Sequence, residues 1–159
     1  MSTHATFRFV DSDGTCYATI YRHSDGYLEH GGRDIFRFFD AVREQTGDTR
    51  FSDPSYLSAK YVVFLAEMFS YTYDLQEHGW AKTKNQPLDF LSVGMVPEGM
   101  NCGESYRYTI HASSDWGSDS DPEVTYQYMA DWTREGGAVW SDPKPLTREG
   151  CEPKQEVEA

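Results

Sequence analysis

The sequence has only three cysteines, Cys16, Cys102 and Cys151, and no two of them form a Cys-x-x-Cys motif. An odd number of isolated cysteines does not make a disulfide framework and favours a reducing compartment. The first residues, MSTHATFRFVDSD, lack the charged segment and apolar run of a secretion signal. No apolar run approaches the roughly 20 residues that span a bilayer. These absences predict a protein of the cytoplasm that has no membrane segment.

Positive charge is also scarce, because 14 Lys and Arg residues stand against 26 Asp and Glu residues, for a net charge of −12. Direct binding to nucleic acid draws on clustered basic side chains, so this composition argues against it. Anionic membrane surfaces repel such a protein as well. A basic protein surface would attract it, including the groove of a nucleic-acid-binding protein. The alternative is that the acidity only supports solubility.

Known catalytic and cofactor motifs are missing: the sequence has no G-x-G-x-x-G, no G-x-x-x-x-G-K and no nucleophile elbow. No two histidines have the helical i, i+4 spacing of a metal site, and none clusters with a cysteine at zinc-finger spacing. The segment DSDGT resembles the start of a calcium loop, but its glycine comes two residues early and no glutamate closes it. We therefore predict no metal, no cofactor and no enzymatic activity.

What the chain does contain is aromatic residues, which make up 15% of it and have to supply much of the core. Alternating side chains predict strands, and apolar residues at helical spacing predict two helices, the second beginning at Asp53-Pro54 and ending at Gly79. The predicted elements are, in order, strands 5–10 and 16–22, helices 33–47 and 53–79, and strands 89–96, 105–112 and 124–132. This order predicts an α+β fold in which an antiparallel sheet of about five strands carries both helices on one face. We expect one domain over 1–140 and a flexible acidic tail over 141–159.

The segment IYRHSDGYLEHGG, residues 20–32, gathers polar and aromatic side chains between a predicted strand and a predicted helix. A histidine oriented by an acid, with an arginine to hold an anion and a tyrosine to stack on a base, would suit a small hydrolase or a nucleotide-binding site. The residues of this candidate site are Arg22, His23, Asp25, Tyr27 and His30. The alternative is a structural corner, in which Ser24-Asp25-Gly26 makes a turn and Arg22 and Asp25 form an ion pair that holds it.

A second candidate is the acidic loop, residues 113–123, which carries four acids around a tryptophan. The segment from Glu98 to Glu135 has a charge of −6, half of the net charge in about a quarter of the chain. Spaced acids can imitate the phosphates of a nucleic-acid backbone, can gather a hard cation, or can simply be solvated. Tryptophan among charges is typical of a protein-binding surface. The predicted partner-binding residues are Asp115, Trp116, Asp119, Asp121 and Glu123.

The opening hairpin, the corner and the helix after it resemble a group of small phage and prophage proteins whose strand ends in Tyr-Arg-x-x-Asp-Gly-Tyr. The matching residues here are Tyr21, Arg22, Asp25, Gly26 and Tyr27, and Leu28 stands where many of that group have proline. The resemblance covers about the first 45 residues and implies a mobile-element origin. Small acidic proteins of mobile elements are often similar to anti-defence proteins such as anti-CRISPR inhibitors, which present acids in place of phosphates.

Together these features favour an anti-CRISPR-like binding protein that inhibits a basic nucleic-acid-binding host defence complex. A small-nucleotide-binding protein or hydrolase built on the corner is the alternative. A structural or chaperone-like subunit is a third possibility, and it would require an obligate oligomer.

Overall fold

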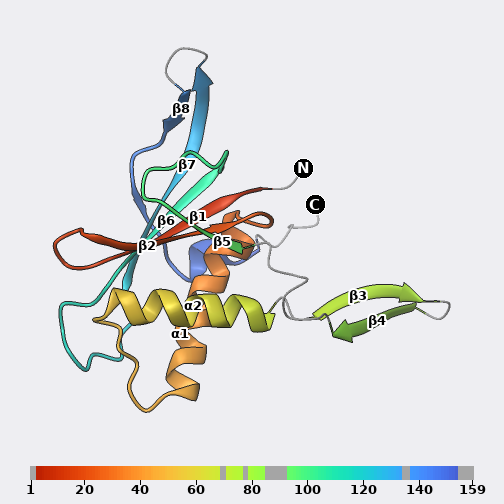
Figure 1. Ribbon diagram of the computed structural model, residues 1–159, viewed down its shortest axis with the longest axis horizontal. Coiled ribbons are helices and arrows are strands. Elements are labelled where there is room, and N and C mark those ends of the chain that lie inside the picture. The colour runs from red at the N-terminus through yellow and green to blue at the C-terminus, as the bar shows by residue number, and fades with distance from the viewer. Residues whose placement is uncertain (1–2, 69–70, 77–78, 85–92, 134–136, 154–159) are drawn as a thin grey trace, which may run out of the picture.

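The computed structural model describes residues 3–68, 71–76, 79–84, 93–133 and 137–153. Over these residues two α-helices, α1 (Arg33–Gln45) and α2 (Pro54–Met68), pack on one face of a seven-stranded sheet (Figure 1). Its strands are β1 (Ala5–Val10), β2 (Cys16–Arg22), β5 (Val93–Val96), β6 (Tyr106–His111), β7 (Glu123–Thr133), β8 (Gly137–Trp140) and β9 (Lys144–Pro145). A separate hairpin consists of β3 (Tyr71–Gln76) and β4 (Gly79–Lys84). None of the described helices is long and apolar enough to cross a membrane.

The predicted α+β class with two helices is confirmed, but the predicted five-stranded antiparallel sheet is wrong in detail. The strand order is β5-β2-β1-β6-β7-β8, with β9 beside β7, and β1 runs parallel to β6. The sheet is therefore mixed. Strand direction depends on how the chain crosses between distant strands, and the residue alternation of β1 and β6 is the same for either direction.

The opening hairpin forms as predicted, with β1 antiparallel to β2. The Asp11 carboxylate accepts hydrogen bonds from the backbone N–H groups of Asp13 and Thr15, both at 2.9 Å. Gly14 has φ of +83°, a left-handed conformation that glycine adopts without a steric penalty. Local turn chemistry therefore fixes this part of the fold.

The second helix begins as predicted but ends early. Asp53 Oδ1 accepts hydrogen bonds from the N–H groups of Ser55 and Tyr56, at 3.1 and 3.2 Å, as an N-cap does. The helix ends at Met68, and the predicted helical residues 71–76 form β3 instead. The alternation in YTYDLQ, rich in aromatic and β-branched residues, explains why a strand forms there. Residues 89–92 of the next predicted strand lie outside the described residues, and β5 covers the remainder.

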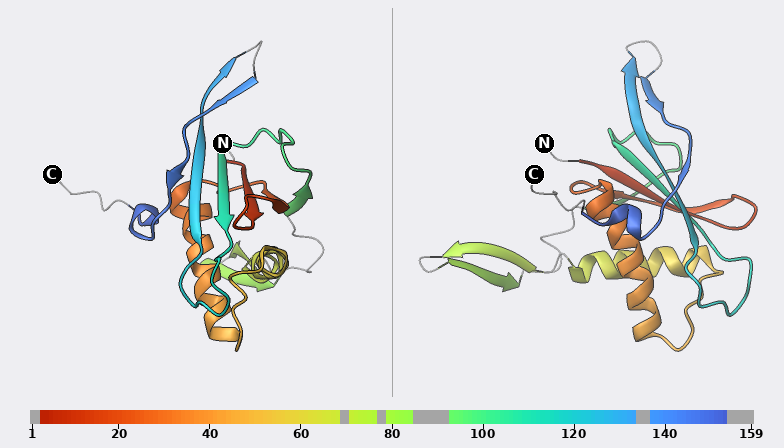
Figure 2. Two further views of the ribbon diagram at one scale, coloured as in Figure 1. Left: turned by 90° about the vertical axis from the view of Figure 1, so that its left-hand side faces the viewer. Right: turned by 180° about the vertical axis from the view of Figure 1, so that it is seen from behind.

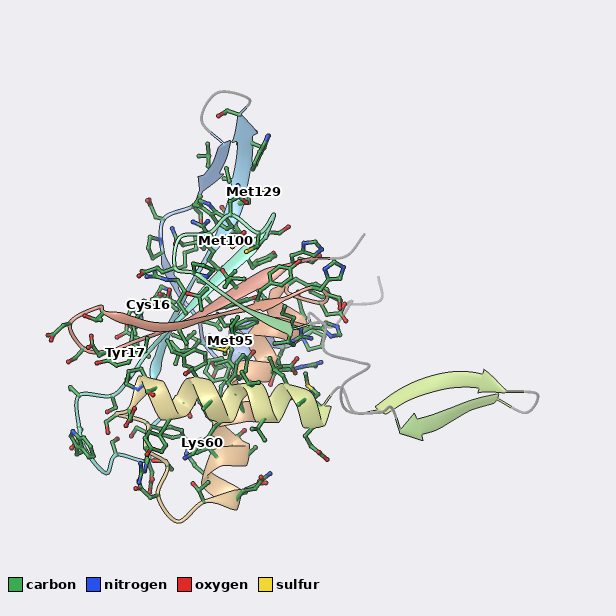
Figure 3. All side chains as sticks on the ribbon, viewed as in Figure 1. Cys16, Tyr17, Lys60, Met95, Met100 and Met129 are labelled. Carbon is green, nitrogen blue, oxygen red and sulfur yellow. The ribbon has the colours of Figure 1, made fainter. Side chains whose placement is uncertain are left out.

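The core between the helices and the sheet is largely aromatic. Phe7, Tyr61 and Tyr108 are all fully buried, and the rings of Phe7 and Tyr108 stack with centroids 5.0 Å apart. The helix α2 is apolar on a second side too, where it borders a groove of about 830 Å³ next to α1. Lys60 reaches from α2 to the carbonyl groups of Asp48 and Thr49 in the loop between the helices (Figure 3).

The longest strand, β7, pairs with β6 and β8 over different halves of its length, in addition to its short pairing with β9. Its first half pairs with β6, and from Met129 onward it pairs with β8. This second half and β8 form an arm that extends beyond the rest of the sheet (Figures 2 and 3). We call residues 129–133 and 137–140 the arm.

The predicted tail does not start at residue 141. In β9, Lys144 and Pro145 pair with β7, and the Leu146 N–H donates to the Val124 carbonyl oxygen at 2.8 Å. Leu146 and Cys151 both belong to the hydrophobic core. Residues 141–153 are therefore part of the folded body, and the remaining predicted tail residues, 154–159, lie outside the described residues.

This packing predicts that the Cys151 thiol is protected. Burial, reinforced by the negative charge of Glu29, raises the pKa of Cys151 to about 11, and the side chain is fully buried. In the native protein at about pH 8, we expect iodoacetamide to modify the half-buried Cys16 well before Cys151, because the thiolate is the reactive species. Peptide mass spectrometry measures both sites, and equal rates at Cys16 and Cys151 would contradict this packing.

Candidate functional site

Arg22, the first residue of the corner candidate, is a buried structural residue. Its side chain is 3% exposed, and its Nη1 donates to Asp34 Oδ2 at 2.8 Å. Its Nε donates to the Ser24 carbonyl oxygen, also at 2.8 Å. The ion pair that we predicted within the corner therefore forms with Asp34 of α1 rather than with Asp25. Arg22 fastens the end of β2 to the start of α1.

The other four residues of the corner candidate take part in different local contacts. The ring of exposed His23 stacks on His4, with centroids 4.4 Å apart. The rings of Tyr27 and His30 contact each other edge to face, with their centroids 4.7 Å apart. Asp25 is exposed and has a left-handed backbone, with φ of +55°. His23 and the Tyr27–His30 pair thus have different ring partners within the corner.

The acidic loop is attached to the body on both sides of its exposed tip. The Ser113 N–H donates to the Phe51 carbonyl oxygen at 2.8 Å, and the Thr49 hydroxyl donates to the Ser118 carbonyl oxygen at 3.4 Å. Between these two attachments, Asp115 is exposed and Trp116 is 82% exposed. The loop therefore presents a large apolar side chain to solvent from an anchored base.

The base of the loop belongs to an ion-pair network that joins α1, the acidic loop and the C-terminal segment. Arg148 binds both oxygens of Asp40, at 2.8 and 2.9 Å, and its Nε donates to Asp121 Oδ2 at 2.9 Å. Arg43 pairs with Asp40 and Asp121 as well, and its Nε donates to the Asp119 carbonyl oxygen at 2.8 Å. Two arginines balance two aspartates, so Asp121 adds little net charge to the loop.

The network predicts a specific shift in acid titration. Hydrogen bonds from Arg148 hold the pKa of Asp40 below its ordinary value, and the charges of Arg148 and Arg43 act in the same direction. A carboxyl group whose pKa is lower in the folded state stabilises the fold at pH values above its pKa in the unfolded chain. This contribution is lost as the pH falls through the pKa of the folded state. We expect Arg148→Ala to raise the Asp40 pKa toward its ordinary value, as measured by NMR titration of the carboxyl carbon. An unchanged Asp40 pKa would mean that Arg148 does not bind it in solution.

The five predicted partner residues are thus divided among different environments. Asp115 and Trp116 lie at the tip of the loop, Asp119 is exposed near its base, and Asp121 is held by Arg43 and Arg148. Glu123 opens β7 and lines a cleft of about 290 Å³ on the outer face of the sheet, the face away from the helices. Glu123 therefore belongs to a different surface from Trp116.

The sequence interpretation missed this outer cleft. Arg8, Arg107 and His111 line it, from strands β1 and β6. Alternation does place each of these residues opposite a buried aromatic or aliphatic neighbour, so their face could have been predicted. Their proximity could not, because it depends on the parallel pairing of β1 with β6.

Metal chemistry has no obvious centre in the described part of the chain, where no three His, Cys, Asp or Glu side chains come together in an arrangement that could hold an ion. Comparison of the chain with protein-family models, with curated proteins and with solved structures gives no match.

Proposed function

We propose that the chain is an acidic protein-binding module that docks on a basic surface of a nucleic-acid-binding protein complex in the cytoplasm. In this proposal the chain comes from a mobile element and inhibits a host defence complex, in the manner of an anti-CRISPR protein. The observation that carries the proposal is the exposure of Trp116, 82%, at the tip of an anchored loop. Burying a tryptophan of this kind against a partner is a common source of interface binding energy.

Charge supports the same docking surface. Asp115 and Asp119 are exposed beside Trp116, and the chain as a whole carries −12. Opposite charge on a partner speeds encounter and sets orientation, while the desolvated tryptophan contributes affinity. Asp121 would act indirectly by keeping the loop in place through Arg43 and Arg148.

Anchoring of the loop favours binding, because a preorganised segment loses little conformational freedom when it docks. The hydrogen bonds of Ser113 and Ser118 flank the tip on both sides. An acidic loop that served solubility alone would need neither this anchoring nor an exposed tryptophan.

The test is capture of a partner from a bacterial host lysate on the immobilised chain, with bound proteins identified by mass spectrometry. We expect Trp116→Ala to weaken binding of the captured complex by about 30-fold, the effect of losing one interface hot spot. Trp132→Ala is the matched control, because Trp132 is also exposed, at 55%, but lies on the arm. Equal losses for the two variants would contradict docking through the loop.

The electrostatic part of the proposal has its own measurement. Added salt and added single-stranded DNA should both weaken the complex, because salt screens exposed charges and DNA competes for a basic channel. Asp115→Asn should weaken binding more than Asp13→Asn, which removes an exposed acid from the turn of the opening hairpin. Binding that neither salt nor DNA affects would rule out a basic nucleic-acid channel as the partner surface.

A further inference from the structure

The outer cleft is lined by polar side chains from three adjacent strands. Arg8 comes from β1, Arg107, Thr109 and His111 from β6, and Thr125 from β7, with Glu123 and Gln127 at its sides. Arg8 and Thr109 are directly paired across β1 and β6, and Thr109 is paired with Thr125 across β6 and β7. Arg107 precedes Thr109 by two residues and so lies about 7 Å along the same face. The side chains of Arg8, Arg107 and Thr109 therefore line the same cleft from one face of the sheet.

Arg107 is held in place on two sides. Its Nε donates to Glu104 Oε1 at 2.9 Å, and its guanidinium lies over the Trp140 ring at 3.8 Å from the centroid. Glu104 is itself buried, and its second oxygen accepts the Cys102 N–H at 2.9 Å. No other hydrogen bond involves the Arg107 guanidinium within the described residues, so its Nη groups keep free donors.

Arg8 is held in a similar way by one acid. It forms an ion pair with Glu98 from the connection between β5 and β6. The side chains of Arg8 and Arg107 are only 32% and 28% exposed, respectively. Partial burial strengthens their interaction with an anion, because water screens the charges less than on an open surface. A guanidinium has five N–H donors, so one carboxylate partner leaves donors for a ligand.

Other polar side chains of the cleft add further hydrogen-bonding groups. The Gln127 amide is oriented by its hydrogen bond to the Ser141 carbonyl oxygen at 2.9 Å, and His111 Nε2 lies 3.2 Å from the Thr125 hydroxyl. The Thr109 hydroxyl has no hydrogen bond of its own in the described structure; in the register Thr109 lies directly opposite Arg8 and two residues from Arg107. Guanidinium groups form strong charge-assisted hydrogen bonds with phosphate, so two arginines with hydroxyl and amide groups in one cleft suit a phosphate group.

We propose that the outer cleft binds a small phosphate-bearing molecule, a phosphate monoester whose phosphate lies over Thr109 between Arg8 and Arg107. A volume of about 290 Å³ is at the lower end of the range for small-molecule sites, so the ligand has the size of a mononucleotide or a sugar phosphate. Glu98 and Glu104 are positioning residues for the two arginines. Glu123, at the side of the cleft, opposes anion binding through its charge. This proposal does not depend on docking through Trp116.

The experiment is titration of the full chain with inorganic phosphate, with adenosine monophosphate and with ribose 5-phosphate, by calorimetry and by backbone amide NMR. We expect saturable binding of the two phosphate monoesters, with shifted amide signals at Arg8, Arg107, Thr109 and Thr125. Arg8→Ala should weaken binding at least tenfold, since a hydrogen bond to a charged group is lost. Thr109→Val, which keeps the side-chain shape and removes the hydroxyl, should weaken it severalfold.

Two further variants and a second anion complete the test. Glu123→Gln should bind phosphate monoesters more tightly than the original chain, because it removes a repelling charge without emptying the cleft. Trp116→Ala should bind phosphate monoesters with unchanged affinity, because Trp116 lies on the acidic loop and not in the cleft. Absence of saturable binding, equal binding of acetate at matched ionic strength, or binding that persists in Arg8→Ala and Thr109→Val would overturn the proposal.

Discussion

Replacing Asp34 by alanine is expected to lower the free energy of unfolding by about 3–5 kcal/mol, the usual result when one partner of a buried ion pair is removed. The side chains of Arg22 and Asp34 are 3% and 5% exposed. Without Asp34, the Arg22 guanidinium would remain buried beside the core without its carboxylate. Urea denaturation followed by circular dichroism measures the change.

Arg37 supplies the matched control for Asp34. Arg37 also binds Asp34, at 3.3 Å, but its side chain is 55% exposed. We expect Arg37→Ala to cost at most about 1 kcal/mol, because an exposed ion pair contributes little. Replacing Arg22 by methionine and Asp34 by leucine together should recover much of the stability, since no buried charge is then left unpaired. Equal losses for Asp34→Ala and Arg37→Ala would show that the inner pair is open to water.

Replacing Gly26 by alanine is expected to destabilise the fold by about 2–3 kcal/mol, or to displace the corner, because the added atom has no space. A Cβ atom at position 26 would lie 2.6 Å from the Cβ of Ala5 and 2.9 Å from the Ala5 backbone nitrogen. The Gly26 carbonyl oxygen also accepts a 2.7 Å hydrogen bond from the buried Tyr108 hydroxyl. The strand β1 and the corner would both have to move.

Gly47 supplies the matched control for Gly26. A Cβ atom at Gly47 meets nothing within 4 Å, so Gly47→Ala should change stability by a few tenths of a kcal/mol or raise it. Thermal unfolding of both variants gives the comparison. A Gly26→Ala protein as stable as Gly47→Ala would mean that β1 and the corner are not in close contact.

These two predictions change the interpretation of the segment IYRHSDGYLEHGG. Its conspicuous polar residues suggested a ligand site, but the buried Arg22 and the closely packed Gly26 hold β2, α1 and β1 together. The sequence analysis had given such a structural corner as the alternative to a ligand site. The sequence did not reveal that Arg22 pairs with Asp34 rather than with Asp25.

The acidic loop, too, was only partly predictable from the sequence. Composition alone drew attention to the acids around Trp116, because charge and aromatic content are visible without a fold. Only the structure separates the exposed Asp115 from Asp121, which Arg43 and Arg148 hold. Arg148 comes from a segment that its proline and charge content had marked as a tail, so its position could not be anticipated.

By itself the sequence determined the α+β class, the opening hairpin and its Asp11 turn, the start of α2 at Asp53, and the acidity that limits the choice of partner. These features follow from side-chain periodicity, capping and composition, which act over a few residues. The tertiary structure alone decided that β1 lies beside β6, that Asp34 pairs with Arg22, and that Arg8 and Arg107 border one cleft. Each of these contacts joins residues that are far apart in the chain. No local sequence pattern specifies such a contact, because it depends on how the whole core packs.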